Sequence, residues 1–196
     1  MSDSRTSSSK ETYTIWTKSL IFHGNGCTVY DSKGVIVYRV DNYGVKNSRE
    51  VQLMDLEGNV LFSLKGKVRT CGSGCWYGYK GTSTKEMPWF QAKETKSCGI
   101  LNRSPIRECK VIMGCDYARG TQESYKIEGK SGKSGFRVVE GGDGGGAVAE
   151  VKKKESWGGG GVLLGDDVLT LVVEPNVDHS LVMALVIVYG LMRNII

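Results

Sequence analysis

The segment Leu181-Val-Met-Ala-Leu-Val-Ile-Val-Tyr-Gly-Leu-Met192 is apolar on every side of a helix, and it decides the fold. The segment Pro175-Asn-Val-Asp178 precedes it, with Pro175 suited to end a strand and Asp178 suited to cap a helix over about 179–192. A helix with no polar face has to be buried on all sides, in a protein interior or in lipid.

The length of this segment favours a protein interior. Twelve residues at about 1.5 Å each reach about 18 Å, well short of the roughly 30 Å hydrocarbon core of a bilayer. Arg193 and Asn194 then interrupt the apolar run. We therefore expect a core helix enclosed by the strands that precede it, with a C-terminal membrane anchor as the alternative.

The chain before the helix has the pattern of a hairpin-rich β protein. Cys27–Val40 and Val51–Leu64 are similar units related by a shift of 24 residues, each with an Asp-x-x-Gly turn between two apolar runs. In such a turn the Asp side chain bonds the turn backbone, and Gly supplies a positive φ. Further expected strands are Val111–Tyr117, Glu123–Glu128, Phe136–Glu140, Ala147–Lys152 and Val168–Val173.

Composition indicates one globular domain. The 196 residues are 40% hydrophobic and 24% charged, which excludes a disordered chain. We expect a flexible polar tail over 1–12 and a single domain over 13–196. The formal net charge of +5 is too small for a dedicated nucleic-acid binder. The N-terminus shows no apolar signal segment, so we expect an intracellular protein, cytoplasmic or nuclear, with reduced cysteines.

Several segments together resemble the plant LURP-one-related (LOR) family, whose fold is similar to the tubby C-terminal domain and to phospholipid scramblases. The similarity covers about Tyr13 to Met192, and no single motif carries it; the order and spacing of the motifs do. The matching segments are Leu20–Gly26, Thr28–Gly34, Val37–Tyr43, Val51–Asp55, Leu164–Leu171, Pro175–Asp178 and Leu181–Val186.

The resemblance implies a mainly β fold, a closed antiparallel barrel of about twelve strands with the hydrophobic C-terminal helix threaded through its centre. It also implies a non-enzymatic binding module. Related proteins bind phosphoinositides or act at membranes, and family members are associated with plant defence. A fold alone does not transfer function, so a protein-interaction scaffold or a transcription-related regulator without lipid binding remains the alternative.

The residues that most often carry catalysis or metal binding show no functional pattern. Cys71 and Cys75 supply one half of a zinc site, but Cys27, Cys98, Cys109 and Cys115 do not supply the other. His23 and His179 have no sequence context that indicates a general base, and Asp166-Asp167 reads as a turn. Gly129–Ser134 lacks the first glycine and the following helix of a phosphate loop. We expect no catalytic residue, cofactor or metal.

Charge distribution is the strongest functional signal. Residues 60–110 contain ten Lys/Arg and three Asp/Glu, whereas 111–196 contain nine and eleven. Basic side chains beside exposed aromatics, for which we expect Trp76, Trp89 and Phe90, can dock on anionic phospholipids. As headgroup ligands we single out Lys65, Lys67 and Arg69. The alternative is that folding scatters the charges over a solvated surface, with protein partners using the loops.

Overall fold

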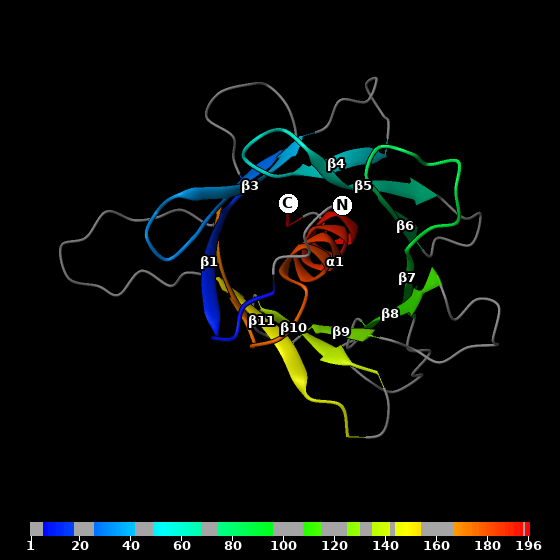
Figure 1. Ribbon diagram of the computed structural model, residues 1–196. Coiled ribbons are helices and arrows are strands. Elements are labelled where there is room, and N and C mark those ends of the chain that lie inside the picture. Colours follow the sequence, from blue (N-terminus) through cyan, green and yellow to red (C-terminus); the bar gives the residue numbers. More distant parts are fainter. Residues whose placement is uncertain are drawn as a thin grey trace.

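The computed structural model describes residues 6–17, 26–41, 49–67, 74–95, 108–114, 125–129, 135–141, 144–153, 167–193 and 195–196. Within them the chain forms a closed antiparallel barrel around one helix (Figure 1). The strands are β1 (Glu11–Trp16), β2 (Cys27–Tyr30), β3 (Ile36–Asp41), β4 (Glu50–Met54), β5 (Val60–Lys67), β6 (Cys75–Lys80), β7 (Phe90–Thr95), β8 (Glu108–Met113), β9 (Tyr125–Gly129), β10 (Phe136–Glu140), β11 (Ala147–Lys153) and β12 (Val168–Val173), and the helix is α1 (His179–Met192).

Strand order around the barrel follows chain order, and β1 closes it by pairing with β12 in full register from Glu11–Val173 to Trp16–Val168. Closure leaves no unpaired sheet edge. The expected barrel with its central helix is thereby confirmed.

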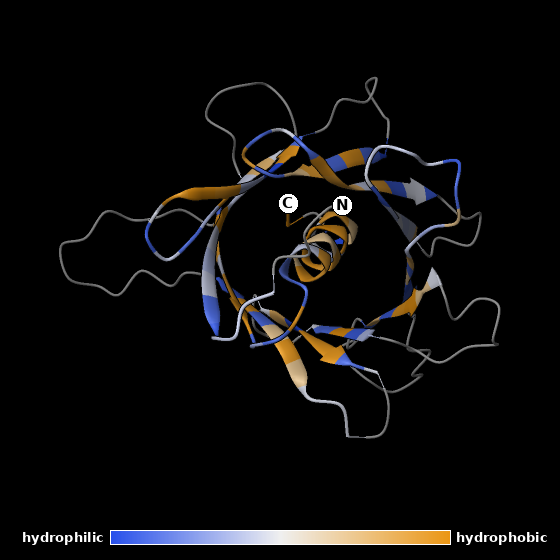
Figure 2. Cartoon of the chain, in the orientation of Figure 1, coloured by the Kyte–Doolittle hydropathy of each residue, from blue (hydrophilic) through white to orange (hydrophobic). Residues whose placement is uncertain are grey.

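Helix α1 occupies the barrel interior, as its apolar sequence requires. The twelve residues from His179 to Gly190 are all buried, and most of the helix has the apolar colour in Figure 2. The Asp178 Oδ1 atom accepts hydrogen bonds from the backbone N–H groups of Ser180 (3.0 Å) and Leu181 (3.2 Å), which confirms the expected N-cap. Within the described residues, no helix is long and apolar enough to span a bilayer.

The two repeated hairpins have the same turn. The Asp31 Oδ1 atom accepts from the N–H groups two and four residues later, both at 2.9 Å, and Asp55 does so at 3.0 and 2.8 Å. Gly34 and Gly58 have φ values of 78° and 84°. Both turns therefore match the geometry expected from the Asp-x-x-Gly pattern.

Some element boundaries differ from expectation because charged residues form half-exposed strands. β8 begins at Glu108, three residues before the expected Val111, because Glu108 and Lys110 point outward while Cys109 is buried inside. For the same reason β1 begins at Glu11, inside the segment expected as a tail. The Thr6 backbone also bridges to Asp178.

Candidate functional site

Four lysines lie in one row across the outer wall of the barrel, with Cys75 between the first two. In the register of neighbouring strands, Lys67 is opposite Cys75, Cys75 is opposite Lys93, Lys93 is opposite Lys110, and Lys110 is opposite Lys126. Residues opposite each other in a sheet point to the same face. We call Lys67, Lys93, Lys110 and Lys126 the lysine row; it crosses from β5 to β9.

Neighbouring residues establish that the lysine row points outward. Trp76 and Ala92 pair with each other one position along, and both are buried in the core. Cys109 pairs with Ile127, and both are completely buried. Because side chains alternate between the two faces of a strand, the lysines between these positions face solvent. Lys67, Lys93 and Lys110 are exposed.

The lysine row is electrostatically unfavourable for the barrel itself. Lys110 has a lysine directly opposite it on each neighbouring strand. Like charges in directly opposed positions destabilise a sheet, by roughly 0.2–1 kcal/mol for each pair. Folding alone would therefore favour alternation of charge here, and an anionic ligand would remove the repulsion.

The β9 end of the row is neutralised. The Lys126 Nζ atom lies 3.1 Å from carboxylate oxygens of Glu108 and Glu128, and these hydrogen bonds raise the pKa of Lys126, Glu128 contributing most. Glu128 also contacts Arg137 at 2.7 Å. The Arg137 hydrogen bond holds the pKa of Glu128 below its ordinary value. The charge of Lys126 is therefore balanced by ion pairs within this cluster.

Lys67 and Lys93, toward the other end of the row, keep their positive charge. The Lys67 Nζ atom lies 5.2 Å from the centre of the Tyr77 ring, a cation–π contact that leaves the charge in place. Lys93 makes no ion pair within the described part of the chain. With strands about 4.8 Å apart, Lys67 and Lys110 are separated by roughly 14 Å along the row. This span can accommodate more than one phosphate group.

The structure places the three expected headgroup ligands in three different situations. Lys67 belongs to the lysine row. Lys65 lies on the same strand, but its Nζ atom is 3.2 Å from the Glu50 carboxylate, which balances its charge. Arg69 lies outside the described residues. The local charge excess pointed to β5–β8, but the register that places Lys93 and Lys110 beside each other cannot be read from composition.

The expectation of three exposed aromatics was wrong for two of them. Trp76 is 6% exposed and Phe90 is completely buried, because both point inward. Glycines opposite them make the room: a Cβ added at Gly66 would lie 2.9 Å from the Trp76 ring, and one at Gly78 would lie 2.2 Å from Phe90. Trp89 is 44% exposed.

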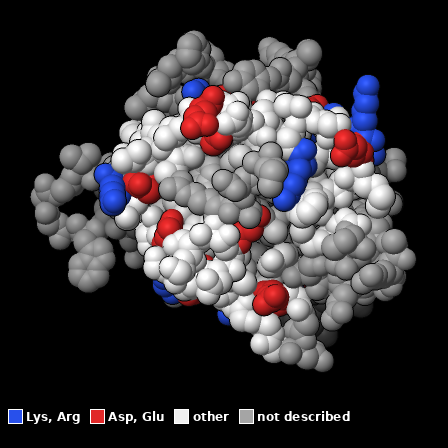
Figure 3. Space-filling view, in the orientation of Figure 1, with Lys and Arg blue, Asp and Glu red and all other residues white. Residues whose placement is uncertain are grey.

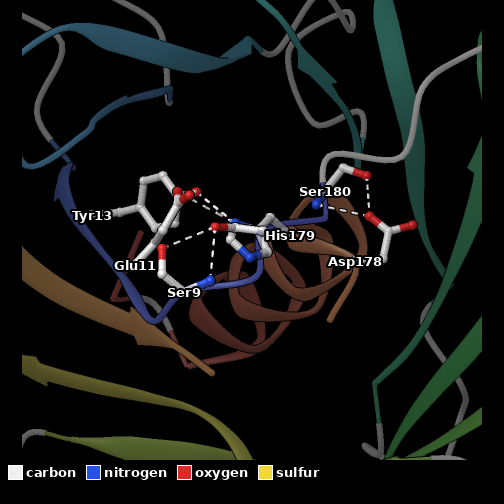
Figure 4. Close-up of polar contacts among 7 residues, drawn as sticks. Ser9, Glu11, Tyr13, Asp178, His179 and Ser180 are labelled. Atoms are coloured by element: carbon white, nitrogen blue, oxygen red, sulfur yellow. Dashed lines mark hydrogen bonds and ion pairs between the residues drawn. The ribbon is translucent and has the colours of Figure 1, made fainter. Parts of the chain in front are cut away.

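His179 belongs to a buried polar cluster at the start of α1 (Figure 4). Its Nδ1 atom is 2.6 Å from the Tyr13 hydroxyl, which donates a 2.5 Å hydrogen bond to the Glu11 carboxylate. Figure 4 shows Ser180 directed to Asp178 and away from His179, so the two do not form a nucleophile–base pair. The cluster joins α1 to β1, in keeping with the structural role expected for His179. His23 lies outside the described residues.

The cysteines that the structure describes are separate and buried. Cys27, Cys75 and Cys109 are not joined in disulfide bonds and lie on three different strands. Burial, with a smaller contribution from the Asp41 charge, raises the pKa of Cys27 to about 12, so its thiol is inert. Among the described residues, no three His, Cys, Asp or Glu side chains are arranged to hold a metal ion. Cys71, Cys98, Cys115 and Asp166 lie outside them.

The fold defines the class of this protein as a closed β-barrel that encloses its C-terminal helix. Comparison with known proteins gives the family. The family model described as LURP-one-related matches residues 11–190. The chain belongs to this family.

Relatives and a solved structure agree with the family model. The chain is 44% identical to Protein LURP-one-related 3 of Arabidopsis thaliana over 94% of this chain and 80% of the relative. It is 40% identical to Protein LURP-one-related 4 of the same plant, over 96% of this chain and 81% of the relative. An X-ray structure of an Arabidopsis thaliana protein superposes with a TM-score of 0.66 at 17% identity, covering 93% of this chain and 91% of that one, which shows the shared fold.

Proposed function

We propose that this chain is a non-enzymatic intracellular binding module whose lysine row docks on anionic phospholipids, phosphoinositides in particular, in plant defence signalling. The observation that supports it is the pair of directly opposed lysines on β7 and β8, Lys93 and Lys110. A barrel under selection for stability alone has no use for that arrangement, whereas clustered phosphates neutralise it.

The proposed surface lies on the wall of the barrel rather than on the end seen along its axis. Figure 3 shows basic and acidic side chains interspersed over that end. On the wall, the β7–β8 register places Lys93 directly opposite Lys110. An anionic membrane therefore finds its attractive partners on the β5–β8 side, where each basic residue near the surface contributes about 1 kcal/mol.

Co-sedimentation with vesicles tests the proposal. Purified full-length chain is mixed with phosphatidylcholine vesicles, with or without phosphatidylinositol 4,5-bisphosphate, at low and physiological salt. The proposal predicts salt-sensitive binding to the anionic vesicles alone. The double variant Lys93→Gln/Lys110→Gln should bind about 30-fold more weakly, the equivalent of about 2 kcal/mol.

A matched control separates the site from net charge. Lys33 and Lys85 are exposed on loops at one end of the barrel, so Lys33→Gln/Lys85→Gln removes the same charge elsewhere. This control should bind like the wild type. Equal binding of the wild type to neutral and anionic vesicles, or equal weakening by both double variants, would contradict the proposal.

A further inference from the structure

Residues 6–10 cross the end of the barrel at which α1 begins, before the chain enters β1. Figure 1 shows this segment beside the start of the helix. We call it the N-terminal strap. The Thr6 backbone bridges to Asp178, and the Ser7 carbonyl accepts a 2.8 Å hydrogen bond from the Asn176 N–H. The strap is therefore held on the β12–α1 connection, which carries the cap of the helix.

An ion pair holds the other end of the strap. The Lys10 Nζ atom lies 2.5 Å from the Glu174 carboxylate, and both side chains are exposed. β1 then begins at Glu11, which belongs to the buried cluster around His179, and Figure 4 shows Ser9 beside this cluster. A surface segment near a chain end that is held by contacts of this kind can open locally while the rest of the barrel stays folded.

The strap presents the Ser8 side chain to solvent. Ser8 is exposed, whereas the hydroxyls of Ser7 and Ser9 lie 3.2 Å apart and bond to each other. Arg5, which lies outside the described residues, stands three positions before Ser8 in the sequence. Basophilic protein kinases select serines with an arginine at this spacing, because carboxylates of the kinase groove pair with the guanidinium. The sequence around Ser8 therefore matches the substrate class of these kinases.

A phosphate on Ser8 would be close to several carboxylates. Lys10, two residues further on, is already paired with Glu174, and Glu11 and Asp178 lie at the two ends of the strap contacts. A phosphoserine carries about −1.5 to −2 charges at pH 7, so it repels these carboxylates and competes with Glu174 for Lys10. The N–H groups at the start of α1, which attract phosphates when unbonded, already donate to Asp178. Repulsion therefore outweighs attraction.

We propose that Ser8 is phosphorylated by a basophilic protein kinase and that the phosphate releases the N-terminal strap from the β12–α1 connection. The Ser8 Oγ atom attacks the γ-phosphorus of ATP, ADP leaves, and the hydroxyl proton passes to a base of the kinase. Pairing of β1 with β12 starts at Glu11 and is retained. Alternate strands run in the same direction, so Lys67 at the end of β5 is far from the start of β1, and release leaves the lysine row unchanged.

Incubation of the purified full-length chain with ATP and the catalytic subunit of cyclic-AMP-dependent protein kinase tests the modification site. Mass spectrometry should locate the phosphate on Ser8. Arg5→Gln should lower the initial rate at least tenfold, whereas Ser9→Ala should leave it unchanged. Ser32 is the matched control: it is exposed in the β2–β3 turn but has Val29 three positions before it, and it should stay unmodified.

Hydrogen exchange of the Asn176 amide, followed by NMR, measures release, because this N–H donates to the Ser7 carbonyl. We expect at least tenfold faster exchange in the phosphorylated chain. The Thr17 amide, which donates to the Asp167 carbonyl at the other end of β1, should keep its rate. Lys10→Gln removes the ion pair without adding a phosphate, and it should accelerate exchange at Asn176 by a smaller factor.

Either of two results would overturn the proposal. Phosphorylation of Ser8 that is no faster than that of Ser32 would remove the modification site. Phosphorylated chain whose Asn176 amide exchanges at the unmodified rate, or more slowly, would show that the phosphate does not release the strap. Neither measurement contains lipid, so the outcome is separate from that of the vesicle experiment.

Discussion

Lys93→Glu should make the barrel more stable while weakening its proposed function. The substitution replaces the Lys93–Lys110 pair of like charges by a pair of opposite charges in the same register position. Removing the repulsion and adding the attraction each contribute up to about 1 kcal/mol in a sheet. Exposure to solvent reduces the sum, and we expect a gain of about 0.5–1 kcal/mol in the free energy of unfolding.

Urea unfolding followed by tryptophan fluorescence measures this gain. The gain should be present at low salt and nearly vanish at 1 M salt, where the screening length falls to about 3 Å. In thermal unfolding it corresponds to a rise in Tm of about 2–3 °C for a chain of this size.

Lys152→Glu is the matched control, because it changes the net charge equally on the far wall. The Lys152 Nζ atom lies 2.9 Å from the Glu150 carboxylate, so this substitution replaces an ion pair by two like charges. It should lower stability slightly. If Lys93→Glu is no more stable than the wild type at low salt, or if both variants gain equally, the repulsion argued for the lysine row is absent.

Three further predictions concern the frame that holds this surface. Gly78→Ala places a Cβ 2.2 Å from the Phe90 ring and should cost about 1–3 kcal/mol in urea unfolding, with partial recovery in Gly78→Ala/Phe90→Leu; a neutral effect would mean that the ring can move aside. Asp178→Ala removes the cap of α1 and should lower stability by about 1 kcal/mol, whereas Asp178→Asn should retain most of it. The Arg137 and Lys126 hydrogen bonds lower the pKa of Glu128 below its ordinary 4.5, so they stabilise the fold above that pH. The difference in unfolding free energy between wild type and Glu128→Gln, under about 1 kcal/mol, should therefore be present at pH 7 and be lost as the pH falls below 4.5 through the folded-state pKa.

The helix and the turns could be predicted from sequence because their signals are local. The apolar run to Met192 has no polar face, and Asp178 stands where a cap is needed, so the helix could be placed without knowledge of its neighbours. The turns at Gly34 and Gly58 follow equally from adjacent residues. The closed barrel and its strand number came from the family resemblance, since strand pairing is not a local property.

The candidate site depended on information that the sequence does not contain. Lys93 and Lys110 are separated by 16 other residues, and only the β7–β8 register places them directly opposite each other. In the same way, the sequence suggested that Trp76 and Phe90 are exposed at a membrane surface. The strand register instead places them opposite Gly66 and Gly78 on the inner face of the barrel. A one-position change of register would reverse every such assignment.

Lysine acetylation footprinting in the presence of vesicles tests the central claim most directly. The chain is acetylated briefly with and without vesicles that contain phosphatidylinositol 4,5-bisphosphate, and mass spectrometry gives the modification of each lysine. We expect vesicles to protect Lys67, Lys93 and Lys110, while Lys33 and Lys85 at the hairpin loops remain as reactive as in their absence. Protection of Lys33 and Lys85 with Lys93 and Lys110 still reactive would place the membrane at the wrong end of the barrel and contradict the account.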